Sequence, residues 1–201
     1  MVAPYVTDEV RPLVSPAPST LQVVDKAATD GVAHEFVNLS SEPSSELAAE
    51  LAGAAEWLGV RPEEILLAAL GRALGRTRGE GLVTVDVTGG HRWLFHGVSL
   101  LCSSEPTMTP TEMLQGAHTA LAAAPGRPST RSEVLLNLDG AAEDGVRDGH
   151  VLELNARRVD EELHLDWWYD ATRFDPYSVE EIVEQFPQAL IEITSDAASP
   201  L

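Results

Sequence analysis

The sequence predicts one α+β domain with a mixed β-sheet and about four helices. Segments with helical periodicity and segments with strand periodicity follow one another in the order strand, two helices, two strands, helix, three strands, helix. This order lacks the regular strand–helix alternation of a doubly wound fold. The chain has 201 residues, of which 44% are hydrophobic and 22% charged. Such a composition is typical of a globular domain with its own core.

Four segments repeat apolar residues at helical spacing. The first begins after Ser41 or Ser44, both of which are suitable N-caps. In the second, Gly71 and Gly75 lie four residues apart, which indicates close packing against a neighbouring element rather than ligand binding. In the last, Pro187 predicts an interruption, since an internal proline removes a backbone hydrogen bond. The first expected helix starts after Ser41 or Ser44 and ends before Gly59, and the others span residues 63–79, 111–124 and 178–193.

Six segments carry apolar and β-branched residues in strand-like patterns. The last two form an expected hairpin around Asp160-Glu161, a two-residue turn that lacks the usual glycine. On the final strand, Trp167 and Tyr169 face one side and Trp168 faces the other. An exposed Trp168 would be a candidate partner-binding residue, and burial under the last helix is the alternative. The expected strands span residues 34–39, 82–87, 98–102, 133–138, 151–159 and 162–169.

Residues 1–33 differ from the patterned part of the chain. Four prolines punctuate this segment, and Ser, Thr and Ala fill much of the rest. Because proline disfavours regular structure, we expect an extended or disordered N-terminal arm. A short strand or helical turn around residues 21–26, and an arm that docks on a partner, are the alternatives. The domain itself is expected to span residues 34–195, followed by a short tail at 196–201.

The charge balance argues against two classes of partner. The 32 acidic and 13 basic side chains give a formal net charge of −19, which repels nucleic-acid phosphates and anionic lipid headgroups. We therefore expect no nucleic-acid partner and no membrane partner. A single cysteine, Cys102, excludes an internal disulfide. No signal peptide is visible, and no apolar run approaches the roughly 20 residues that span a bilayer, so the expected location is cytoplasmic.

The chain contains no complete motif for metal, cofactor or nucleophilic chemistry. Its six histidines form no H-E-x-x-H helix, and one cysteine cannot build a thiolate zinc site. No metal and no cofactor is therefore expected. His164 and Asp166 share one strand face and could orient a general base, but an ordinary hydrogen bond is the preferred interpretation. The Thr-Gly-Gly-His-Arg segment at 88–92 could form an anion nest, with a simple turn preferred.

Several segments resemble, in the same order, motifs of one known family. The segment EEILLAALGRALGRTRG at 63–79 looks like "D-x-L-L-x-A-L-x-x-A-L", and VDVTGGHR at 85–92 resembles "V-E-G-H-G-R". CSSEP at 102–106 stands in the place of "F-T-x-x-Y-P", and EVLLNLDG at 133–140 resembles "V-L-F-N-Y-L-G". From 34 to 195 the chain thus resembles the C-terminal lobe of the condensation and epimerization domains of nonribosomal peptide synthetases.

The resemblance implies a single chloramphenicol-acetyltransferase-like lobe. In the family, two such lobes form a V with an acyl-carrier tunnel between them, and the catalytic "H-H-x-x-x-D-G" belongs to the N-terminal lobe. The implied partners are an N-terminal condensation lobe, a carrier protein, or a second copy of this chain in a homodimer. The implied substrate-tunnel or former-site positions are Thr88, His91, Arg92 and Asn137.

The departures from the family pattern predict a lobe without catalytic residues. No two histidines are adjacent, and the proposed acid/base glutamate of "V-E-G-H-G-R" aligns with Thr88, which cannot titrate near neutral pH. The tyrosine of "F-N-Y-L-G" is also absent, with Leu138 near its place. We therefore expect a noncatalytic half condensation-domain-like protein that pairs with a partner chain or carrier protein in nonribosomal peptide biosynthesis. The alternatives are the C-terminal subunit of a split condensation or epimerization enzyme, and a small homo-oligomeric acyltransferase using His91, His96 or His164.

Overall fold

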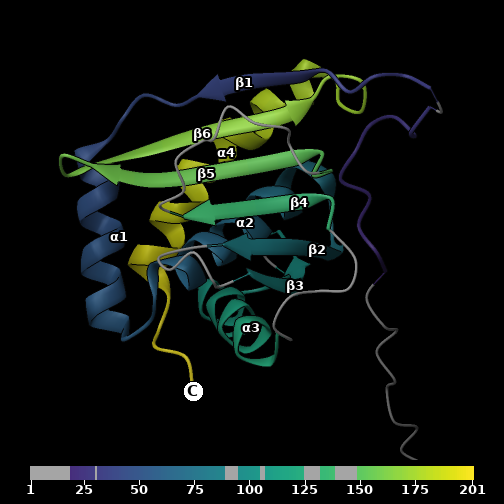
Figure 1. Cartoon of the computed structure of the whole chain (residues 1–201). Helices are drawn as coiled ribbons and strands as arrows, with labels where there is room; N and C mark the ends of the chain where they lie inside the picture. The colour runs from purple at the N-terminus through teal and green to yellow at the C-terminus, as the bar shows by residue number, and fades with distance from the viewer. Residues whose placement is uncertain (1–18, 30, 89–94, 105–106, 125–131, 139–148) are drawn as a thin grey trace, which may run out of the picture.

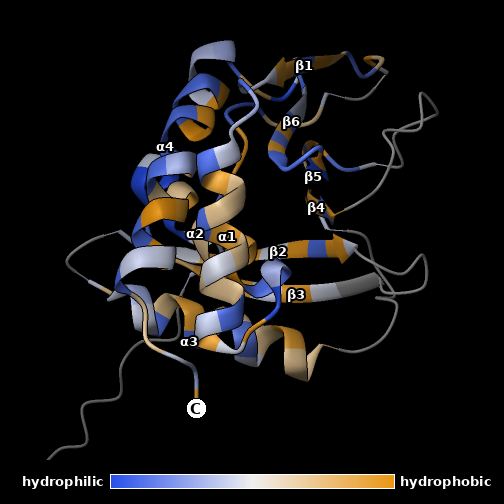
Figure 2. Ribbon diagram, turned by 90° about the vertical axis from the view of Figure 1, so that its left-hand side faces the viewer, coloured by the Kyte–Doolittle hydropathy of each residue, from blue (hydrophilic) through white to orange (hydrophobic). Residues whose placement is uncertain are grey.

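The computed structural model describes residues 19–29, 31–88, 95–104, 107–124, 132–138 and 149–201. These residues form one six-stranded sheet and four helices, in the order expected from the sequence. Within this part of the chain the helices lie on one side of the sheet (Figures 1 and 2). The predicted α+β class is confirmed. None of the described helices is long and apolar enough to cross a membrane.

The bounds of the elements agree with the sequence prediction to within a few residues. The strands are β1 (Phe36–Ser40), β2 (Gly81–Thr88), β3 (Phe95–Cys102), β4 (Val134–Leu138), β5 (Leu152–Val159) and β6 (Glu162–Asp170). The helices are α1 (Ser45–Leu58), α2 (Pro62–Arg78), α3 (Pro110–Ala123) and α4 (Pro176–Asp196). Of the two N-cap candidates for α1, Ser44 is the cap, since its hydroxyl accepts a hydrogen bond from the Leu47 N–H.

The sheet is mixed, with the strand order β1-β6-β5-β4-β2-β3. Strand β4 is parallel to β2 and to β5, and the other neighbours are antiparallel. The expected hairpin joins β5 to β6, and its turn residues Asp160 and Glu161 have φ angles of 49° and 68°. Two positive φ angles are the requirement of a type I′ turn. The chain therefore makes this tight turn without a glycine.

Helix α4 runs through Pro187 without a break, so the predicted interruption is wrong. Phe186 before the proline and Leu190 after it are both fully buried, and α4 packs along α2. A proline inside a helix costs about 3 kcal/mol of helix propensity. Burial of the apolar stripe on both sides of Pro187 holds the helix together, because tertiary packing outweighs this local cost.

Helix α2 crosses the centre of the molecule, and its glycines allow it to approach β3. A Cβ atom added to Gly75 would lie 2.3 Å from the carbonyl carbon of Ser103, and one added to Gly71 would lie 3.0 Å from the carbonyl oxygen of Leu101. Both contacts are to backbone, which cannot rotate away. The predicted close packing at this glycine pair is confirmed.

We expect Gly75→Ala to lower the free energy of unfolding by about 1–3 kcal/mol or more, because overpacking against backbone forces α2 away from β3. The measurement is urea denaturation followed by circular dichroism. Gly53→Ala in α1 is the matched control, since a Cβ there meets nothing within 4 Å. That control is expected to gain up to about 1 kcal/mol from the better helix propensity of alanine. Equal stability of the two variants would contradict the packing argument.

The segment from Ser19 to Lys26 runs extended along the lobe and contributes to its core. The Leu21 N–H donates a hydrogen bond to the Leu82 carbonyl oxygen, and Val23 is completely buried. Asp25 forms an ion pair with Arg78 at 2.6 Å. Partial burial alone would raise the pKa of Asp25, but its hydrogen bonds and Arg78 bring the pKa below its ordinary value. Residues 1–18 of the expected arm lie outside the described residues.

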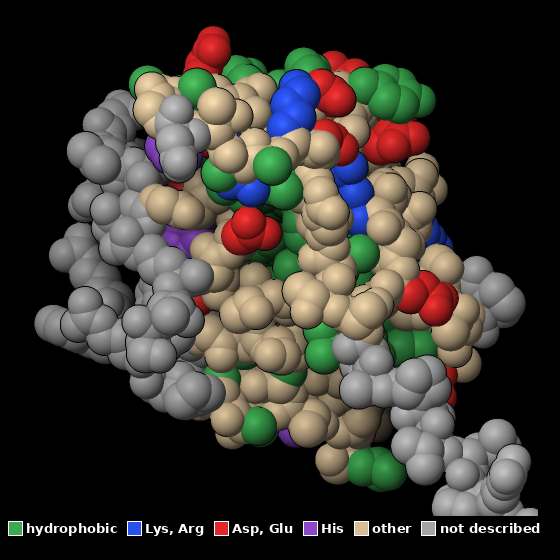
Figure 3. Space-filling model, turned by 90° about the vertical axis from the view of Figure 1, so that its right-hand side faces the viewer, with side chains coloured by type: hydrophobic (Ala, Val, Ile, Leu, Met, Phe, Trp, Pro, Cys, Tyr) green, Lys and Arg blue, Asp and Glu red, His purple; other side chains and the backbone are tan. Residues whose placement is uncertain are grey.

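Figure 3 views the side of the molecule along which this segment runs. Acidic and basic side chains lie next to one another on this side. Lys26 pairs with Asp175 at the start of α4, and Arg173 pairs with Glu133. The segment is thus held by a buried apolar row and by charged contacts to α2 and α4.

Candidate functional site on the helix-free face of the sheet

The face of the sheet that the helices leave uncovered is lined by polar side chains. Strand alternation sends the apolar residues of β2, β4, β5 and β6 toward the helices and their neighbours to the opposite face. One row of directly paired residues crosses five strands on this opposite face. We call it the polar row, and it consists of Thr88, Asn137, Asn155, Asp166 and Ser40.

Hydrogen bonds run along the polar row. The Thr88 hydroxyl donates to the Asn137 side-chain oxygen at 2.8 Å, and the Asn137 amide donates to the Asn155 side-chain oxygen at 2.7 Å. At the other end, the Ser40 hydroxyl donates to Asp166 at 2.6 Å. Thr88 and Asn137, two of the four positions that the resemblance predicted as substrate-tunnel or former-site residues, are therefore in direct contact. The other two, His91 and Arg92, lie outside the described residues.

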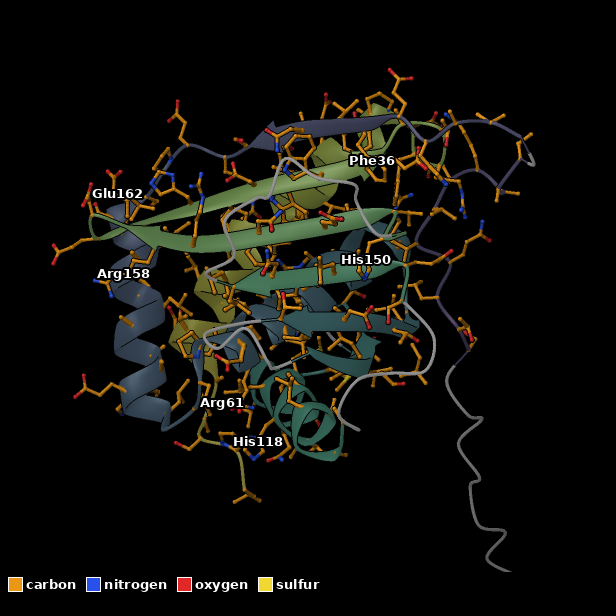
Figure 4. The ribbon with its side chains drawn as sticks, viewed as in Figure 1. Phe36, Arg61, His118, His150, Arg158 and Glu162 are labelled. Atoms are coloured by element: carbon orange, nitrogen blue, oxygen red, sulfur yellow. The ribbon has the colours of Figure 1, made fainter. Side chains whose placement is uncertain are left out.

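A buried carboxylate lies two residues before Thr88 on the same face. Asp86 has no exposed surface. It accepts hydrogen bonds from the Ser132 N–H at 3.1 Å and from the Ser132 hydroxyl at 2.8 Å. His150, labelled in Figure 4, also contacts it, with the ring Nε2 2.8 Å from the carboxylate. These contacts supply the hydrogen-bond partners that a buried carboxylate requires. They also connect β2 to the segments that lead into β4 and β5.

The sequence analysis missed the Asp86 cluster. The available signal was a carboxylate in the middle of the β-branched run Leu-Val-Thr-Val-Asp-Val at 82–87. An acid in a buried strand needs partners, because an unpaired buried charge is too costly. Its partners, 46 and 64 residues farther along the chain, could not be identified from local spacing.

The suggested pairing of His164 with Asp166 is not formed. Asp166 instead accepts hydrogen bonds from Arg157 at 3.0 and 3.2 Å, in addition to that from Ser40. The His164 ring lies 3.9 Å from Glu162. Residues on neighbouring strands lie closer together than residues two apart on one strand, so Asp166 finds its partners across the sheet.

The three consecutive aromatic residues of β6 divide between the two faces, as strand alternation predicted. Trp167 is fully buried against α4, with its ring 5.3 Å from that of Phe186 in an edge-on arrangement. Tyr169 is also buried on this side. Trp168 lies on the helix-free face, half-buried, opposite Glu153 of β5 and Asn38 of β1. Burial under the last helix therefore applies to Trp167 and not to Trp168.

The described side chains bear on two further kinds of chemistry, metal ligation and thiol chemistry. No group of three or more His, Cys, Asp and Glu residues in the described ranges could hold a metal ion. Cys102 is buried, and this burial raises its pKa to about 12. The reactive thiolate form is therefore essentially absent at neutral pH.

Comparison with known proteins shows which proteins this chain resembles. No family model matches the chain. One subunit of the phenolphthiocerol/phthiocerol polyketide synthases of Mycobacterium tuberculosis and Mycobacterium bovis is 27% identical over 242 residues, which cover 89% of this chain and 16% of that polyketide synthase subunit. The chain thus corresponds to a small part of these curated relatives.

Several solved structures have the same fold. The epimerization domain from the third module of tyrocidine synthetase B superposes with a TM-score of 0.67 at 14% identity, covering 90% of this chain and 52% of that chain. The EpoB cyclization-docking bidomain from Sorangium cellulosum gives a TM-score of 0.66 at 14% identity, covering 92% and 46%. The first condensation domain of the calcium-dependent antibiotic synthetase gives 0.60 at 16% identity, covering 91% and 50%.

The chain therefore has the condensation-domain fold, and it spans about half of each of these solved chains. The fold that the sequence motifs implied is confirmed.

Proposed function

We propose that this chain is a noncatalytic C-terminal half of a condensation-type domain, and that it pairs with a partner chain or carrier protein in nonribosomal peptide or polyketide biosynthesis. The fold and its half-domain extent support this proposal, as does the likeness to part of a polyketide synthase. A complete domain needs a second lobe. That lobe would supply the "H-H-x-x-x-D-G" motif, which this sequence lacks.

The main observation in support of a noncatalytic lobe is the contact between Thr88 and Asn137. The resemblance aligns Thr88 with the acid/base glutamate of the epimerization segment, and here its hydroxyl donates to the Asn137 side-chain oxygen at 2.8 Å. Neither side chain titrates near neutral pH. The pair can therefore line a tunnel and orient a neutral polar group, but it cannot transfer a proton. In this proposal His91 and Arg92, which follow Thr88, belong to the same tunnel wall.

The helix-free face is the proposed contact surface for the second lobe. Trp168 lies there, half-buried among hydrogen-bonding side chains. Tryptophan is enriched among residues that dominate binding energy at protein interfaces. A partner lobe would complete the burial of Trp168 and cover the polar row. A second copy of this chain could take the same place and form a homodimer.

The first test measures catalysis by the purified chain with an aminoacyl-loaded carrier protein. Mass spectrometry and chiral analysis are expected to detect no acyl transfer and no epimerization above the protein-free control. Addition of a condensation lobe that carries "H-H-x-x-x-D-G" tests the split-enzyme alternative, because turnover restored only by that addition would favour it. Turnover by the chain alone would overturn the proposal.

The second test measures association by size-exclusion chromatography with light scattering, alone and with the added lobe. We expect a homodimer or a complex, and Trp168→Ala is expected to weaken it by about tenfold or more. Trp57→Ala is the matched control, since Trp57 is 70% exposed on α1 and lies away from the helix-free face. A chain that stays monomeric under both conditions would contradict the proposed pairing.

A further inference from the structure

A cavity of about 240 Å³ lies on the helix side of the sheet, away from the polar row. It opens between α1, the start of α2 and the turn end of the β5–β6 hairpin. The proposed partner surface lies on the opposite face of the sheet, so this cavity remains to be explained.

The interior of the cavity is aliphatic. Leucine and alanine side chains from both helices and three strands form its wall, and none of the lining residues in the described ranges is aromatic. Water inside such a wall would find few hydrogen-bond partners, so an apolar occupant is favoured. A flexible aliphatic chain fits this wall better than a planar ring, which usually packs against aromatic residues. The lining residues that carry this argument are Leu51, Leu66, Leu138, Ala156 and Leu163.

The charged residues among the described lining of the cavity are Glu63, Arg157 and Arg158. Glu63 is 3.5 Å from Arg61, and Arg157 is turned to the other face of the sheet, where it binds Asp166. Arg158 lies on the helix side, because it follows Ala156 by two residues along β5. Figure 4 shows it at the end of the strand beside α1. Within the described part of the chain, its guanidinium has no hydrogen-bond or ion-pair partner.

We propose that this cavity binds a short aliphatic chain that ends in an anionic group, such as a medium-length carboxylate. The chain lies against the leucines of α1, α2 and β6, and the anionic end pairs with Arg158 at the mouth. Guanidinium groups bind carboxylates through two parallel hydrogen bonds. The net charge of −19 opposes the binding of anions in general, so the local positive charge of Arg158 beside the cavity is what favours an anionic end group. The inference does not depend on the proposed function.

The test is titration of the full chain with octanoate and with 1-octanol, by calorimetry and by amide NMR shifts. Octanoate is expected to bind saturably and to shift the amides of Leu66 and Ala156. Ala52→Phe narrows the cavity from its exposed rim, and this variant is expected to lose binding of both probes. Because Ala52 is exposed, the variant is expected to keep its fold, which the circular dichroism melting curve checks.

Arg158→Gln tests the charged end. It is expected to weaken octanoate binding by about threefold to tenfold and to leave 1-octanol binding unchanged. Lys26→Gln removes one positive charge far from the cavity, so it controls for net charge and is expected to bind octanoate like the unmodified chain. Absence of saturable octanoate binding, full binding by Ala52→Phe, or identical octanoate affinity in Arg158→Gln would each overturn the proposal.

Discussion

Replacing Arg72 by leucine is expected to lower the free energy of unfolding by about 3–5 kcal/mol, because it removes one partner from a buried charged network. Arg72 lies in α2 and has no exposed surface. Its guanidinium donates to the carbonyl oxygens of Ser103 at 3.1 Å and Met108 at 2.6 Å. It also lies 3.1 Å from Glu192 of α4. The substitution leaves two carbonyl groups without these donors and removes an arginine that, together with Arg76, pairs with Glu192.

The loss is measured by urea denaturation at pH 7. Arg158→Leu is the matched control, since the same change at an exposed arginine is expected to alter stability by no more than about 0.5 kcal/mol. Arg72→Lys keeps the charge but cannot reproduce the forked set of hydrogen bonds, so an intermediate loss is expected. A loss below about 1 kcal/mol for Arg72→Leu would mean that the network contributes little to stability.

Val23→Asp is expected to destabilise the fold by about 4 kcal/mol or more, because it places a carboxylate where no surface is exposed. Val23 is 0% exposed and belongs to the segment that runs along α2 and β2. Val32→Asp is the control, because Val32 belongs to the same N-terminal region but is 51% exposed. That variant is expected to have the same free energy of unfolding as the unmodified chain.

The stabilities of the two valine variants, measured by thermal and urea unfolding, show where in the sequence the folded lobe begins. A large loss for Val23→Asp alone would place the segment around it in the core, ahead of the boundary at residue 34 that composition suggested. Equal stability of both variants would instead mean that the segment is a detachable arm. The same experiment therefore tests the domain boundary without shortening the chain.

Local sequence predicted the elements well because their signals are local. Apolar spacing identified all four helices and six strands of the described residues, and alternation along β6 separated Trp167 from Trp168. Such patterns state which side of an element is apolar, and this depends only on residues a few positions apart. The failure at Pro187 has a nonlocal origin, since burial of Phe186 and Leu190 in the core and the packing of α4 on α2 maintain the helix.

The hydrogen-bond partners of the polar residues in the candidate site could be identified only from the tertiary structure. Thr88 and Asn137 were singled out by resemblance, but their hydrogen bond follows from the parallel pairing of β2 with β4. The partners of Asp86 follow from the same strand order, as they come from segments far along the chain. Pairing order depends on the packing of the whole sheet, and no local period encodes it.

By itself, the sequence determined the fold class, the bounds of the helices and strands, the alternation of faces on β6, and the absence of an adjacent histidine pair. Only the tertiary structure decided that residues 19–26 join the core, that Arg72 is buried between helices, and that an aliphatic cavity opens beside Arg158. The physical reason is that burial is a property of what surrounds a side chain, and those surroundings come from distant parts of the chain.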